Sequence, residues 1–252
     1  MRQLIIMILI LTALNKVINA QEIITDRPDQ TESSTTVPGK SFQMEMGFGS
    51  GNYNNERLSL FPTVLFRYGL SKSIELRFAE QLAGFNNKAT SEPDFGLSDI
   101  ELGVKIQVLK KEGINTEIAF ISHVIIPTGS SELTNTNYGT INKIAISHGL
   151  NNFLELGYNL GYNYLGTGNG DLTYSLVLGI GLSDKMGMYA ETFGAYSDFT
   201  EFTSNFDSGF TYLVKENLQL DFSLGIGLNH KMKYFSLGFS WNIRRRMQLT
   251  ER

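Results

Sequence analysis

Residues 154–164 read Leu-Glu-Leu-Gly-Tyr-Asn-Leu-Gly-Tyr-Asn-Tyr, and this stretch decides the fold. Leucine and tyrosine occupy every second position, and Glu, Gly and Asn occupy the positions between them. Successive side chains of a β-strand point to opposite faces, whereas a helix would scatter these residues around its circumference. The stretch is therefore predicted to be a strand with one apolar face and one polar face.

The same alternation continues through most of the chain from Lys40 onward. Most of the predicted strands have about ten residues or more, which suits a tilted membrane-crossing strand better than a strand of a soluble sheet. We expect strands at 41–51, 56–68, 74–84, 98–109, 115–127, 139–148, 153–164, 171–182, 186–196, 205–214, 217–228 and 233–244.

The connections between these strands alternate in length. Residues 69–73, 110–113 and 149–152 are tight turns, whereas residues 84–96 and 127–140 form longer links. Short turns on the periplasmic side and longer loops outside are typical of outer-membrane barrels. We therefore predict an all-β fold: a transmembrane antiparallel up-and-down β-barrel of about twelve strands, with both termini in the periplasm.

Alternation alone does not say which face is buried, and a soluble β-sandwich is the alternative. The polar face is rich in Gly, Ser and Asn rather than Lys and Glu, which favours a watery lumen. Tyrosines recur near the strand ends on the apolar face, as in the aromatic girdles of membrane barrels. The last strand, with Gly238, Trp241 and Ile243, resembles the C-terminal assembly signal of such barrels, although a tail follows it here.

Composition and the N-terminus define the compartment and the domains. The chain has no cysteine, which excludes disulfides and thiolate metal sites, and its net charge of -4 gives no basic patch for nucleic acid. Arg2, the apolar run 4–11 and Ala20 are typical of a secretory signal peptide. We expect a signal peptide at 1–20, a polar periplasmic N-terminal segment at 21–39, the outer-membrane barrel at 40–244 and a periplasmic C-terminal tail at 245–252.

If lipid contacts the apolar face, the polar face places charged side chains in the lumen. They either pair with one another and hold the wall rigid or bias which solutes and ions pass. The candidates for this selectivity role are Arg67, Glu75, Arg77, Glu101, Lys105, Glu117, Lys143, Glu155 and Asp221. We predict no metal site and no cofactor.

The stretch Thr-Asp-Arg-Pro-Asp-Gln-Thr-Glu-Ser at 25–33 precedes the first strand and is dense in charge. Followed by an all-β chain of this length, it resembles the transporter-like outer-membrane family described as "putative MetA-pathway of phenol degradation". The resemblance implies export or uptake of aromatic or other small compounds. As a separate hypothesis, the segment folds into the periplasmic mouth as a plug or latch through Asp26, Arg27, Asp29 and Glu32; the alternative is a disordered leader.

The predicted function is a porin-like outer-membrane channel for passive passage of small solutes, with aromatic or hydrophobic compounds as one candidate class. The alternatives are a barrel-scaffold enzyme of the lipid hydrolase or protease type and a structural or adhesin barrel. Among the histidines, His148 follows Ser147 directly, but neighbours along a strand point to opposite faces and cannot pair. The expected partners are outer-membrane lipid, the barrel assembly machinery and an unidentified small solute.

Overall fold

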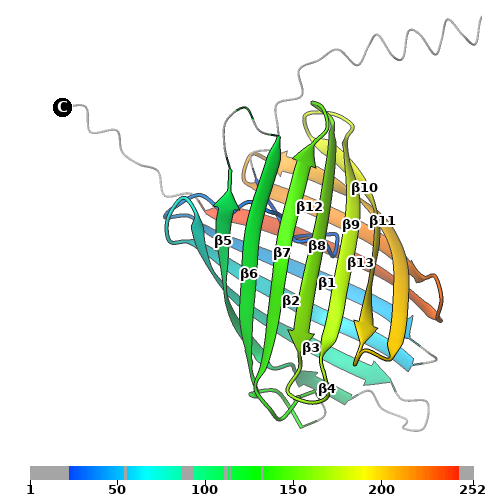
Figure 1. Ribbon diagram of the computed structural model, residues 1–252. Helices are drawn as coiled ribbons and strands as arrows, with labels where there is room; N and C mark the ends of the chain where they lie inside the picture. The colour runs from blue at the N-terminus through cyan, green and yellow to red at the C-terminus, as the bar shows by residue number, and fades with distance from the viewer. Residues whose placement is uncertain are drawn as a thin grey trace, which may run out of the picture.

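The computed structural model describes residues 23–53, 56–86, 94–110, 113, 115–131 and 133–243. The predicted signal peptide at 1–20 and the predicted tail at 245–252 lie outside these residues. The strands form a tilted antiparallel barrel (Figure 1). They are β1 (Phe42–Tyr53), β2 (Glu56–Gly69), β3 (Ile74–Asn86), β4 (Asp94–Leu97), β5 (Ile100–Leu109), β6 (Thr116–Ile126), β7 (Gly139–Gly149), β8 (Leu154–Tyr164), β9 (Asp171–Gly181), β10 (Met186–Ser197), β11 (Glu201–Lys215), β12 (Leu218–Gly227) and β13 (Met232–Ile243).

The barrel closes because its first and last strands pair. Each long strand pairs antiparallel with its neighbours in the chain, and β1 also pairs with β13 along its whole length, from Phe42 with Ile243 to Tyr53 with Met232. Closure leaves no long strand edge unpaired, which is the condition for a β-structure to cross lipid. The predicted all-β antiparallel barrel with twelve strand positions is confirmed.

The wall departs from the predicted strands at one position. The strand expected at 98–109 is divided into β4 and β5, which both pair with β3: Leu82 lies opposite Leu97, and Ala79 lies opposite Glu101. The two residues between them, Ser98 and Asp99, interrupt the ladder as a bulge. β4 and β5 therefore occupy one strand position of the barrel.

A second irregularity lies in β2. Its register with both neighbours shifts between Leu60 and Thr63, so Phe61 and Pro62 together lie opposite one residue of β1 and one of β3. Proline has no N–H to donate to the ladder, which explains why the bulge falls here.

Burial on the barrel is the reverse of burial in a soluble protein. Leu160 and Leu224 are 60% and 54% exposed on the outer face, whereas Arg67 and Lys105 are fully buried on the inner face. Large apolar side chains left in contact with the surroundings all around the barrel indicate that the surroundings are lipid. The described residues include no helix long and apolar enough to cross a membrane.

Candidate functional site

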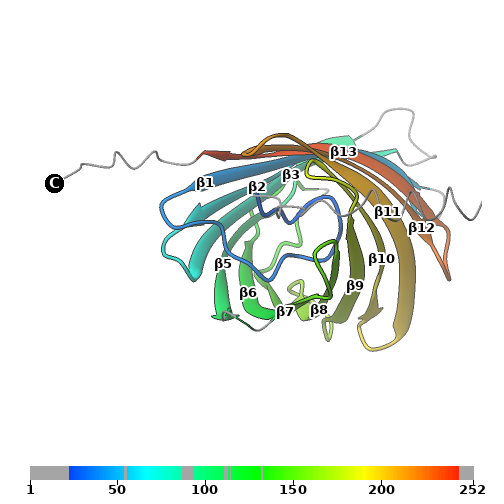
Figure 2. The same cartoon turned by 90° about the horizontal axis from the view of Figure 1, so that it is seen from above.

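Residues 23–37, here called the plug segment, lie inside the barrel. Figure 2 shows this blue stretch crossing the ring of strands from one side to the other before the chain enters β1. Its end near Val37 lies at the end of the barrel with the short turns, where Thr36 donates a hydrogen bond to the carbonyl of Lys72 at 3.1 Å. The strands that provide its hydrogen-bond and ion-pair partners are β1, β2, β3, β5, β6, β7, β8, β9, β10, β12 and β13.

Asp26 connects the plug segment to three cations of the wall. Its carboxylate lies 2.7 Å from Arg77, 2.9 Å from Lys105 and 3.3 Å from Arg67. All four side chains are at least nine-tenths buried. Removing one partner from a buried charge cluster costs about 3–5 kcal/mol because the remaining charges lose their compensation. Asp26 is therefore the strongest single attachment of the plug segment.

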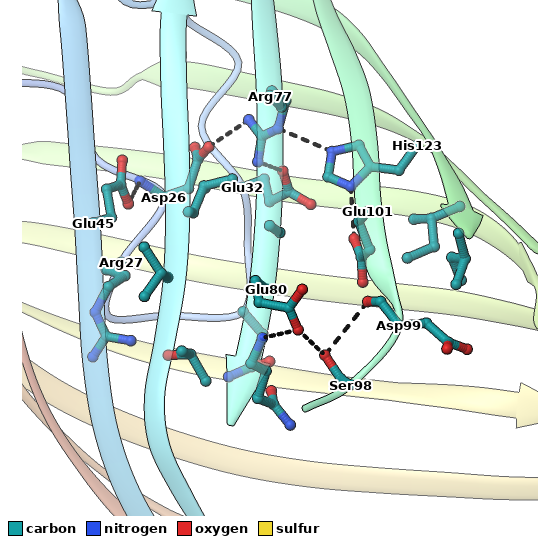
Figure 3. Close-up of a pocket in the computed structure, with 18 of the residues that line it drawn as sticks. Asp26, Arg27, Glu32, Glu45, Arg77, Glu80, Ser98, Asp99, Glu101 and His123 are labelled. Atoms are coloured by element: carbon teal, nitrogen blue, oxygen red, sulfur yellow. Dashed lines mark hydrogen bonds and ion pairs between the residues drawn. The ribbon is translucent and has the colours of Figure 1, made fainter. Parts of the chain in front are cut away.

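Glu32 makes a second attachment on the same side of the barrel. Its two carboxylate oxygens lie 2.6 Å from Arg77 and 2.7 Å from Lys143. The side chain of Asn159 completes the contact, since it accepts a hydrogen bond from the Glu32 N–H and donates one to the Glu32 carbonyl. Arg77 thus contacts Asp26 and Glu32 together, and it also donates to His123, as Figure 3 shows.

On the opposite side of the barrel, acidic side chains of the wall make most of the contacts with the plug segment. Glu191 accepts hydrogen bonds from the Gln30 N–H at 2.7 Å and from the Thr31 hydroxyl. Thr31 also donates to Ser175 at 2.7 Å. Among the residues that the structure describes, a single ion pair connects the plug segment to strands β8 to β13. It joins Arg27 and Asp221 at 2.8 Å.

The electrostatic surroundings of the three plug carboxyls differ in sign. Burial alone would raise the pKa of Asp26, but Arg67, Lys105 and Arg77 outweigh it and hold that pKa well below its usual value. Lys143 and Arg77 likewise outweigh burial and lower the pKa of Glu32. Asp29 differs, because burial and the nearby Glu191 carboxylate together raise its pKa well above the usual value.

Two glycines make room for the Arg27 guanidinium. A Cβ atom at Gly47 would lie 2.0 Å from Arg27 Nη1, and one at Gly238 would lie 2.5 Å from Arg27 Nε and 2.6 Å from the Met46 carbonyl oxygen. Gly238, singled out in the sequence as part of an assembly signal, therefore also has a place in the lumen. Trp241 and Ile243 are exposed on the apolar outer face.

We expect Gly47→Ala to loosen the plug segment without weakening the barrel. The new methyl group would displace the flexible guanidinium and break its pair with Asp221, a loss of about 1.5–3 kcal/mol for a hydrogen bond between charged groups. More frequent channel opening in planar bilayers would show this. Gly179→Ala is the control, because a Cβ there meets nothing nearer than a carbonyl oxygen at 3.8 Å. Equal behaviour of the two variants would contradict the prediction.

Beside the plug segment lies open space toward the longer connections, here called the loop-end vestibule. It comprises two adjoining cavities of about 450 Å³ and 410 Å³. Both end on Arg27 and Gln30 of the plug segment, and the wall of the larger one includes Leu133 and Leu165 from the longer connections. A solute entering from the loop end would therefore meet the plug segment as the floor.

The lumen candidates occupy three kinds of position. Arg67, Glu75 and Lys105 are completely buried behind the plug segment, and Arg77 is 5% exposed. Glu101 and Lys143 line the larger cavity. The others lie toward the short turns or against the plug segment: Glu117 pairs with Lys110 and accepts a hydrogen bond from Thr35, Glu155 is exposed near the turn end, and Asp221 holds Arg27.

Several residues of the site were not singled out as candidates. Asn159 and Ser175 face inward by simple alternation, and that alternation was the available signal for them. Tyr189 and Tyr234 also face inward, and Tyr234 donates a hydrogen bond to Asp207. In the sequence these tyrosines look like the girdle residues of the outer face, so their role could be found only from strand register.

Each of the three histidines has contacts among the described residues, and none of these contacts is with a serine hydroxyl; His230 lies against Asn229 and Tyr53. His123 has one ring nitrogen on Glu101 at 2.7 Å and the other on Arg77 at 3.0 Å, which leaves neither for a hydroxyl nucleophile. His148 contacts Thr116 and Tyr158, while the neighbouring Ser147 contacts Ser34 of the plug segment. In the part of the chain that the structure describes, no group of three or more His, Asp or Glu residues is arranged to hold a metal ion.

Comparisons with known proteins agree with this architecture. The COG4313 outer membrane channel from Pseudomonas putida F1 matches with a TM-score of 0.68 at 13% identity, over 86% of this chain and all of that one. The KdgM porin in complex with disordered oligogalacturonate matches with a TM-score of 0.57 at 9% identity, over 79% of this chain and 99% of that one. At these identities the likeness is one of fold. No curated protein matches the sequence.

The family is identified by a match of the amino-acid sequence to a family model. A family model described as "Putative MetA-pathway of phenol degradation" matches residues 25–244, a range that includes residues 25–37 of the plug segment and all strands of the barrel. The chain therefore belongs to this family and has the barrel fold of outer-membrane channels.

Proposed function

We propose that this protein is an outer-membrane channel through which small solutes pass passively, and that the plug segment closes it until the segment is displaced. The observation that carries the proposal is the inverted burial of the barrel together with a vestibule that ends on the plug segment. A polar lumen gives solutes a watery path, and the attachments of the plug segment are all non-covalent and reversible. No cofactor is needed for diffusion along such a path.

The vestibule suits a solute with an apolar body and a polar head. The lining of the larger cavity includes the apolar side chains of Ile125, Ile141 and Leu133 together with polar ones such as His123 and Lys143. Binding sites for small organic molecules commonly combine such an apolar wall with a few placed polar groups. The family description, which mentions phenol degradation, supports aromatic compounds as one class of solute.

The proposal also covers the location and assembly of the chain. The signal peptide at 1–20 would direct export, and the short turns with both chain ends would face the periplasm. Gly238, Trp241 and Ile243 would be recognised by the barrel assembly machinery. These roles are supported by the sequence pattern and by the place of β13 as the strand that closes the barrel.

Purified protein reconstituted in planar bilayers and in liposomes tests the channel directly. We expect discrete conductance steps and swelling of the liposomes in small neutral solutes, including phenols. Heat-modifiable migration in gels would confirm that each preparation is folded. A folded barrel that gives neither conductance nor swelling, with or without the plug segment, would contradict the proposal.

The opening of the channel should depend on pH through Asp29. Its pKa is raised in the closed state, so the closed state holds this proton more tightly and gains stability as the pH falls. That stability is lost as the pH rises from about 4, the ordinary value for Asp, through the raised value. The groups that face Asp29 are Glu191 of β10, Asp207 of β11 and Asp26 of the plug segment itself.

We therefore expect opening to become more frequent as the pH is raised, and Asp29→Asn to flatten this dependence. Single-channel recordings of both proteins across a pH series would measure it. A variant that keeps the full pH dependence of the wild type would show that another group is responsible.

A further inference from the structure

The two halves of the lumen wall carry different charge. The charged residues that face inward on β1 to β7 are of both signs: Glu45, Glu75, Glu101 and Glu117 lie among Arg67, Arg77, Lys105 and Lys143, and Glu80 of β3 also lines the larger cavity. Inward-facing residues of β8 to β13 include four carboxylates as well, namely Glu155, Glu191, Asp207 and Asp221. Among the described inward-facing residues of these six strands there is no Lys or Arg.

The centre of the acidic half is the pair formed by Glu191 and Asp207. They lie directly opposite each other on β10 and β11, and they are 1% and 0% exposed. Glu191 accepts hydrogen bonds from the backbone N–H of Gln30 and the hydroxyl of Thr31, and Asp207 accepts them from the hydroxyls of Tyr189 and Tyr234; all four donors are neutral. The described residues give neither carboxylate a cation within ion-pair distance, so no ion pair offsets a negative charge on this pair.

Buried oxygen atoms without partners lie in the same wall. Asp207 Oδ1, Asn205 Oδ1 and Ser223 Oγ are buried and make no hydrogen bond within the described residues. Ser223 and Tyr234 also line the smaller cavity of the loop-end vestibule, so this wall borders space that a solute can enter. Oxygen atoms that lack donors beside such a space are suited to a cationic guest, because a cation can interact with every one of them.

The charge imbalance does not depend on the plug segment. Displacing that segment removes Asp26, Asp29 and Glu32 together with Arg27, and among the described residues of the wall the carboxylates still outnumber the cations. Rings of acidic side chains favour cations in channels, and a low-dielectric wall of one sign concentrates counter-ions inside it. The raised pKa of Asp29 is consistent with a negative potential near this wall, since burial and the neighbouring Glu191 both disfavour a negative charge on Asp29.

We propose that the acidic wall of β8 to β13 makes the open channel prefer cations, both inorganic ones and small organic solutes with an ammonium group. Glu191 and Asp207 are the residues that determine this preference. The inference rests on the proposed channel function and specifies which solutes it favours.

Reversal potentials in planar bilayers with a KCl gradient test the sign of the selectivity. We expect the protein lacking residues 23–34 to pass K⁺ over Cl⁻ by about tenfold, the low end of the range by which a cleft of one charge sign concentrates counter-ions. Glu191→Gln combined with Asp207→Asn should bring the ratio close to one. Glu117→Gln is the matched control on β1 to β7, where cations lie among the carboxylates, and it should change the ratio less than Asp207→Asn alone.

The possible outcomes separate the inference from the function on which it rests. A conducting channel that prefers Cl⁻ would overturn the cation preference and leave the channel intact. An effect of Glu117→Gln as large as that of Asp207→Asn would overturn the assignment to this wall. A folded barrel without any conductance would overturn the channel and the inference together.

Discussion

Removal of residues 23–34 should raise the single-channel conductance several-fold. The plug segment has partners on strands all around the barrel, and both vestibule cavities end on it. Without it, the inward-facing Gly, Ser and Asn side chains would leave a continuous watery passage. Planar-bilayer recordings of the shortened and full-length proteins would measure the change. Equal conductance would show that the segment does not limit the path.

A disulfide lock between the plug segment and the wall tests whether the segment must move for the channel to open. The hydroxyl oxygens of Ser34 and Ser147 lie 2.8 Å apart, so cysteines at these positions would bring their sulfur atoms within bonding reach. The chain has no cysteine of its own, and the lock would therefore be the one disulfide. We expect oxidised Ser34→Cys/Ser147→Cys protein to open rarely and to recover on reduction.

The single variants Ser34→Cys and Ser147→Cys are the controls for the lock. They change the same two side chains but cannot cross-link within one barrel, so reductant should leave their conductance unchanged. If the oxidised double variant conducts like the reduced one, solutes pass without movement of this part of the plug segment.

The sequence predicts the wall of the barrel well because one period governs it. Strict alternation, as in β8, assigns each residue to a face as soon as lipid is assigned to the apolar side. The errors fall where tertiary contacts interrupt the ladder. Asp99, between β4 and β5, accepts hydrogen bonds from the backbone N–H groups of Gly129 and Asn135, which belong to a distant connection. No local pattern announces such a contact.

For the plug segment, the sequence predicts the general location but not the individual contacts. Its charges favour a place in a polar lumen, but residues 23–37 have no period, and so no register says which wall residue each side chain meets. Asp29 illustrates the difference. It has the same charge as Asp26 and lies three positions later, yet it lies near Glu191 while Asp26 lies among three cations.

This difference leads to the second large effect, that of Asp26→Asn. The substitution leaves Arg67, Arg77 and Lys105 buried with less compensation, and Lys105 has no other ion pair among the described residues. A penalty of about 3–5 kcal/mol on the closed state corresponds to more than about a hundredfold in the balance between closed and open channels. We expect the variant to be open most of the time in bilayer recordings. The pKa of Asp26 lies well below its usual value, so wild type should keep this attachment at every pH above about 4.

Asp29→Asn is the matched control, because it removes the same charge from the same segment in the opposite surroundings. Above the ordinary pKa of Asp it relieves repulsion from Glu191 and Asp207, so it should make the closed channel more stable. Opposite signs for Asp26→Asn and Asp29→Asn, with both barrels showing wild-type heat-modifiable migration, would establish that local charge holds the plug segment. Changes of the same sign would mean that the total charge of the segment, or its fit in the lumen, governs closure instead.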